Sequence, residues 1–105
     1  MVIINKIREH FENDSIEFQV EHFDGDVWKY KCHEIILDID NISVIYNVQI
    51  DQVRIPEEET NSYIEKTPFI DVEIDRVYLD EIEVRLSNQQ NFVLENILIN
   101  AIKVI

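Results

Sequence analysis

Carboxylates are the side chains of this sequence best able to do chemistry, and three of them stand at alternating positions. Asp71, Glu73 and Asp75, which we call the acidic row, are separated by single apolar residues, and this is the pattern of a half-buried strand. Alternate side chains of a strand share one face, so the three carboxylates should follow one another roughly 6.6 Å apart. Such a row repels itself unless water or a basic partner lies against it.

The segment around the acidic row carries much of the charge of the chain. Between residues 56 and 86 there are ten acidic and three basic residues, a balance of −7. A Lys- and Arg-rich protein surface would be complementary to such a segment, whereas the plainer interpretation is the solvated face of an antiparallel sheet. The candidate partner-binding residues are the carboxylates of this segment that could share one surface: Asp71, Glu73, Asp75, Glu81, Glu83, Glu57, Glu58 and Glu59.

Other combinations of reactive side chains are weak. Cys32 and His33 are neighbours in a predicted strand, so their side chains should point to opposite faces and cannot pair as nucleophile and base. The three histidines lack metal-ligand spacing, and residues 24–26 lack the further ligands of a calcium loop. The sequence therefore predicts no catalytic residue and no cofactor, with a metal-dependent hydrolase built on the acidic row as one alternative.

Glycine is scarce, and its scarcity excludes two large classes of nucleotide enzyme. The chain has one glycine, Gly25. Phosphate-binding loops of the P-loop and dinucleotide types need several glycines, because the backbone must approach the phosphates closely.

The net charge of −13 at pH 7 points to the kind of partner. Binding to nucleic acid or to an anionic membrane uses clustered Lys and Arg, and this chain does not have them. We expect no direct nucleic-acid contact and a basic protein partner. Imitation of duplex DNA is disfavoured, because one row of carboxylates is sparser than one charge per roughly 1.7 Å of duplex.

Length and cysteine content predict one domain, residues 1–105, in a reducing environment. The chain has 105 residues and a single cysteine, which cannot form an internal disulfide. The N-terminus does not have the pattern of a secretory signal, and no apolar run approaches the ~20 residues of a membrane helix. We therefore expect a cytoplasmic protein.

Apolar periodicity predicts a helix first and then a hairpin. Ile3, Ile4, Ile7 and Phe11 form one helical stripe, which should end at the turn-forming residues 13–15. Residues 16–33 then alternate with period two. A three-residue loop at 24–26 is predicted because it pairs residues whose numbers sum to 50: Glu21 with Lys29, Val20 with Tyr30, Phe18 with Cys32 and Glu17 with His33.

A second hairpin follows, with changes of apolar parity on either side of it. A two-residue turn at Asp40 and Asn41 pairs Ile39 with Ile42, Leu37 with Val44 and Ile35 with Tyr46. Parity slips near Glu34, Asp51 and Arg76 predict bulges or bends. Pro56 should end the strand, and residues 57–67 should form one long loop.

The last third of the chain should contain a hairpin and a hydrophobic helix. Residues 70–86 fit one bent strand or a hairpin that turns at Asp80 and Glu81, and we favour the hairpin. Ser87 and Asn88 are good N-caps for a helix that is apolar over most of its circumference. A strand over residues 97–105 is the alternative, because residue types typical of strands are frequent there.

These elements predict an α+β fold. We expect an N-terminal helix, a strongly bent antiparallel sheet of five or six strands, with a half-open barrel as one form of that curvature, and a C-terminal helix on its concave side. The predicted function is a non-enzymatic inhibitor or antidote that blocks a basic nuclease or other nucleic-acid-binding protein, of the phage anti-defence or toxin-immunity type. The second alternative is an assembly protein that oligomerises through residues 92–105.

Overall fold

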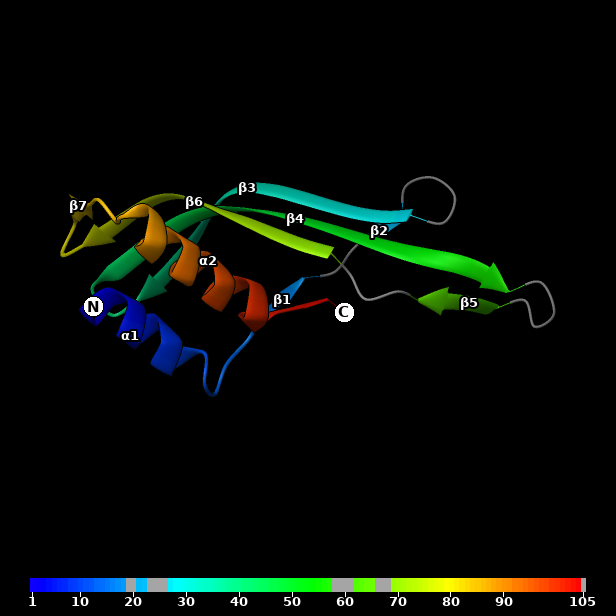
Figure 1. Cartoon of the computed structure of the whole chain (residues 1–105), viewed down its shortest axis with the longest axis horizontal. Coiled ribbons are helices and arrows are strands. Elements are labelled where there is room, and N and C mark those ends of the chain that lie inside the picture. Colours follow the sequence, from blue (N-terminus) through cyan, green and yellow to red (C-terminus); the bar gives the residue numbers. More distant parts are fainter. Residues whose placement is uncertain (19–20, 23–26, 58–61, 66–68, 105) are drawn as a thin grey trace.

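The computed structural model describes residues 1–18, 21–22, 27–57, 62–65 and 69–104. It is the expected α+β fold, with two helices on one face of a bent antiparallel sheet and a separate parallel pair of short strands (Figure 1). The elements are, in chain order, α1 (Val2–His10), β1 (Ile16–Phe18), β2 (Glu21–His22), β3 (Val27–Ile39), β4 (Ile42–Glu57), β5 (Ser62–Glu65), β6 (Phe69–Leu79), β7 (Ile82–Val84), α2 (Asn88–Ala101) and β8 (Ile102–Val104).

The sheet is open and antiparallel. Its strands follow the order β2-β3-β4-β6-β7, and β5 pairs with β4 beyond the end of β6. The described strands do not close into a barrel. Long β3 and β4 strands extend past the helices and give the molecule extents of 56 × 25 × 22 Å. The radius of gyration, 16.3 Å, accordingly exceeds the roughly 13 Å of a compact domain of this length.

The first hairpin has the predicted register, although its strands are shorter than expected. Glu21 lies opposite Lys29 and His22 opposite Trp28, so the numbers of paired residues sum to 50. The predicted pairs of Val20 and the loop at 24–26 lie outside the described residues. The predicted pairing of Phe18 with Cys32 and of Glu17 with His33 is wrong, because β1 runs parallel to β8 and places Phe18 opposite Val104.

The second hairpin is confirmed in turn and register. Ile39 pairs with Ile42, Leu37 with Val44 and Ile35 with Tyr46. Asp40 occupies the left-handed region with φ 53°, which Asp tolerates better than most residues.

Two bulges bend the sheet at one level. In β3 the register shifts between Cys32 and Ile35, with Glu34 at φ 55°, and the Glu34 N–H donates to Oδ1 of Asn47 at 2.9 Å. In β6 the shift falls opposite Ile45 and leaves Asp75 as the extra residue. The predicted slips near Glu34 and Arg76 are confirmed, whereas β4 pairs with β3 through Asp51 without a shift.

Pro56 does not end β4, and residues 57–67 are not one loop. Pro56 pairs with Tyr63 of β5. The even-numbered residues of β4 turn their peptide groups toward β3, and β3 begins opposite Val53. The missing N–H of proline therefore faces a side on which no described strand continues, and this is where a sheet tolerates proline.

The favoured hairpin at Asp80 and Glu81 is confirmed. Leu79 pairs with Ile82, and both turn residues have positive φ, 52° and 66°. Two successive left-handed residues define the type I′ turn that matches the twist of a two-residue hairpin.

The C-terminal helix begins at the predicted cap. Ser87 Oγ accepts from the Gln90 N–H at 3.1 Å, and Gln90 Oε1 accepts from the Ser87 N–H at 2.9 Å, which together form a capping box. The helix ends at Ala101, and the strand alternative holds only for β8. Leu94, Leu98 and the α1 residue Ile7 are fully buried, and they pack with Val44 and other apolar side chains of the sheet into one core.

Ser87→Ala should destabilise the fold by about 1 kcal/mol, because the Gln90 N–H loses the hydroxyl oxygen that accepts its hydrogen bond. Urea unfolding followed by circular dichroism measures this change. Ser87→Thr keeps a hydroxyl cap and should stay close to the wild type. Equal stability of all three proteins would contradict the capping role.

Candidate protein-binding surface

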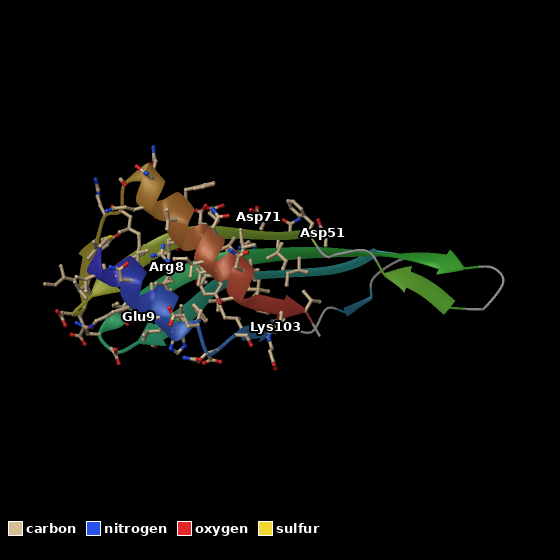
Figure 2. All side chains as sticks on the ribbon, turned by 60° about the horizontal axis from the view of Figure 1, so that its bottom comes forward. Arg8, Glu9, Asp51, Asp71 and Lys103 are labelled. Atoms are coloured by element: carbon tan, nitrogen blue, oxygen red, sulfur yellow. The ribbon has the colours of Figure 1, made fainter. Side chains whose placement is uncertain are left out.

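The acidic row is exposed on the sheet face opposite the helices. Asp71, Glu73 and Asp75 are all exposed, whereas Val72 between them is buried against the core. Because β6 and β4 are in register, Asp71 lies opposite Gln49 and Glu73 opposite Asn47. Figure 2 labels Asp71 on β6 and Asp51 on the neighbouring strand β4.

The bulge adds a cation to one end of the row. Asp75 and Arg76 are both exposed, and their Oδ2 and Nε atoms are 3.6 Å apart. Arg76 Nη1 also donates to the Tyr78 hydroxyl at 3.5 Å. Tyr78 first, and Asp75 second, raise the pKa of the Arg76 guanidinium above its usual value, so Asp75 is the member of the row with a neutralising neighbour.

Asp71 and Glu73 have no ion pair within the part of the chain that the structure describes. The ion pairs found there are His10 with Asp14 and Arg76 with Asp75. Asp71 and Glu73 line a depression of about 190 Å³ together with His33, Asn47, Val48 and Gln49. Amides and one imidazole lie next to two carboxylates for which the described residues show no ion pair. All of these groups can accept hydrogen bonds from Lys or Arg.

Asp51 extends the acidic surface onto β4, and sequence reasoning missed it. Its Oδ2 accepts from Gln49 Nε2 at 3.4 Å, and its Oδ1 is buried without a hydrogen-bond partner in the described region. The second hairpin already places odd-numbered residues of β4 on the outer face, and this signal could have identified Asp51.

Glu83 and Glu81 are separated from Asp71 and Glu73. Glu83 lies opposite Tyr78 on β7 and lines a depression of about 260 Å³ that also contains Arg76 and Arg85. Two guanidinium groups therefore offset this carboxylate and Asp75. Glu83 belongs to the same outer face as the row, in a more balanced environment.

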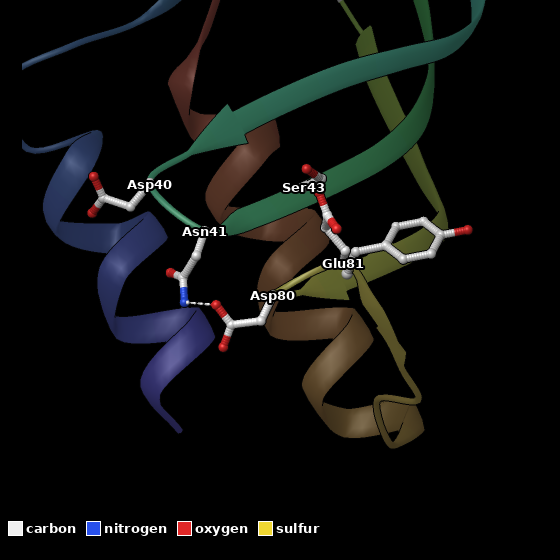
Figure 3. A pocket seen from close by; sticks show the side chains of 6 residues that line it. Asp40, Asn41, Ser43, Asp80 and Glu81 are labelled. Carbon is white, nitrogen blue, oxygen red and sulfur yellow. Dashed lines mark hydrogen bonds between the residues drawn. The ribbon is translucent and has the colours of Figure 1, made fainter.

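Glu81 belongs to the end of the sheet where two turns meet. It lines an open depression of about 680 Å³ with Asp40, Asn41, Ser43, Tyr78 and Asp80 (Figure 3). Asn41 Nδ2 donates to Asp80 Oδ1 at 2.8 Å, and the Asp80 N–H donates to the Asn41 carbonyl at 3.0 Å. These bonds join the two turns, so the polar residues of this depression have a structural role.

The predicted binding glutamates at 57–59 fall in a part of the chain whose side chains the structure does not describe. Glu57 ends β4 opposite Ser62, with its side chain outside the described part, and Glu58 and Glu59 lie outside the described residues. Among the described members of the predicted set, Asp71 and Glu73 share one depression, and Asp75 and Glu83 lie near the arginines.

No described group of three or more His, Cys, Asp or Glu side chains is arranged to hold a metal ion. None of the described helices has the length and apolar character needed to cross a membrane. In comparisons with known proteins, the chain matches no family model, no curated protein and no solved structure.

Proposed function

We propose that this chain is a non-enzymatic inhibitor or antidote that binds a basic, nucleic-acid-handling protein, of the phage anti-defence or toxin-immunity type. The observation that supports it best is that Asp71 and Glu73 are exposed side by side with no described cation against them. Carboxylates of this kind remain available to Lys and Arg of a partner. The net charge of −13 should also speed association with a basic surface.

The assembly alternative has less support than the sequence suggested. That alternative was based on the wide apolar circumference of the C-terminal helix. Leu94, Leu98 and Ala101 are buried within the chain itself, and Phe92 is the large apolar side chain of α2 that stays exposed. The helix therefore already has a covering for most of its apolar surface.

The test is capture of a partner from a lysate of the native host by the immobilised full chain. We expect a basic nucleic-acid-binding protein at low ionic strength and weaker recovery at about 0.5 M salt, where the Debye length is about 4 Å. Addition of the free chain should then inhibit the nucleic-acid activity of the purified partner.

Two double variants make this test specific. Asp71→Asn with Glu73→Gln removes two charges from the outer face and should lower recovery. Glu9→Gln with Glu17→Gln removes two charges from exposed positions on α1 and β1, and recovery should stay near that of the wild type. Equal recovery with both variants, or a partner whose activity is not inhibited, would contradict the proposal.

A further inference from the structure

The free edge of β6 is the second feature that bears on recognition. β6 pairs with β4 along its whole length, whereas β7 covers only Val77–Leu79. Residues 69–76 therefore have a strand on one side and none on the other within the described part of the chain. Such an edge is a template for the addition of another strand.

The strand register determines which peptide groups of β6 point toward its free edge. Leu79 and Ile82 flank a two-residue turn and so form a hydrogen-bonded pair. Counting back through the bulge at Asp75, the residues that turn their N–H and C=O groups to the free edge are Ile70, Val72 and Ile74. The peptide groups of Asp71 and Glu73 then face β4.

One contact supports this assignment independently. The Ile74 N–H donates to Oε1 of Glu95 on α2 at 3.5 Å. A side chain of the helix layer thus reaches an edge donor that a neighbouring strand would otherwise occupy. Toward the start of β6, where Figure 2 shows Asp71 beyond the crossing of α2, Ile70 and Val72 have no such bond among the described residues.

Charge decides which strand fits this edge. A second copy of β6 would bring Asp71 and Glu73 next to their own counterparts, and like charges on neighbouring strands are unfavourable. A strand with Lys or Arg at every second position would instead place its cations beside Asp71 and Glu73 on the outer face. Its intervening side chains would point toward the side of the sheet that carries the helices, where Val72 is buried.

We propose that the edge of β6 along Ile70 and Val72 binds an extended segment of the partner that carries Lys or Arg at alternate positions. Main-chain hydrogen bonds supply affinity in strand addition, and the side-chain pattern supplies specificity. This inference rests on the proposed function, because it says how the same acidic surface would engage its basic partner.

The test uses a ten-residue peptide of alternating Lys and Val and a control peptide of the same sequence. In the control every second backbone nitrogen, on the edge that would face β6, is methylated. Both peptides carry the same charge, and only the first can donate hydrogen bonds to the edge. We expect the control to bind at least about tenfold more weakly in calorimetry, and Asp71→Asn with Glu73→Gln to weaken the first peptide by about tenfold.

Amide hydrogen exchange supplies a second readout that needs no partner. In the free chain the amides of Ile70 and Val72 should exchange at least about tenfold faster than those of Asp71 and Glu73, and the Lys-Val peptide should slow them. Equal binding of the two peptides, binding of neither, or equal protection of all four amides in the free chain would overturn strand addition. Capture of a basic partner would stand as a separate result, so a failure of strand addition can be distinguished from a failure of the proposed function.

Discussion

Leu98→Ala should destabilise the protein by about 3 kcal/mol. Leu98 is fully buried on α2 and belongs to the core cluster that joins both helices to the sheet. The substitution removes three carbon atoms and leaves a cavity that close-packed neighbours fill only in part. Against a typical stability of about 5–15 kcal/mol for a single domain, this is a large loss, and urea unfolding of the two proteins measures it.

Phe92→Ala is the matched control on the same helix. Phe92 is 66% exposed, so its truncation should change the free energy of unfolding by less than about 0.5 kcal/mol. Similar losses for Leu98→Ala and Phe92→Ala would mean that α2 packs differently from the arrangement described above.

Reversal of the charges of Asp71 and Glu73 should have the largest effect on binding. With Asp71→Lys and Glu73→Lys, we expect the association rate with the captured basic protein to fall about a hundredfold at low ionic strength. The change places like charges where the partner approaches, and it also shifts the net charge by four units. Stopped-flow or surface-resonance kinetics at several salt concentrations measures this rate.

A control with the same net charge separates position from total charge. Glu9→Lys with Glu17→Lys makes the same shift in the layer that contains α1, where Figure 2 labels Glu9, and should slow association only a few-fold. If both variants slow association equally, the overall field steers the partner and the outer face has no special role.

Hairpins with two-residue turns were the most predictable part of the fold. Once Asp40–Asn41 is recognised as a turn, the alternation of Leu37, Ile39, Ile42 and Val44 permits one register, because a shift by one residue would turn these side chains to solvent. The same logic identified Asp80–Glu81. Local sequence suffices here, since each pair is only a few residues apart.

Pairs between distant segments were not predictable. β1 lies beside β8, about 85 residues later in the chain, and no local pattern in Ile16–Phe18 indicates that partner. Proline in β4 is a related case. Its effect depends on whether a strand lies on the side that lacks the N–H, and that is a property of the assembled sheet.

The sequence could predict on which face of β6 the carboxylates lie. It could not predict which other side chains come together with them. Alternation alone places Asp71 and Glu73 together on the solvent side of β6. It does not show that a bulge brings Arg76 against Asp75, nor that Asp51 of β4 joins the same surface. The open edge of β6 also requires the topology, because it results from the shortness of β7.

The two bulges have a consequence for how the gene can vary. At His33–Glu34 and at Asp75–Arg76 two successive residues are exposed. Losing one codon there would restore a regular alternation and keep the other side chains of each strand on their present faces, toward solvent or toward the core. Loss of a codon elsewhere in β3 or β6 would turn the apolar residues beyond it toward water. Length changes within these strands should therefore be inherited at the bulges and eliminated elsewhere.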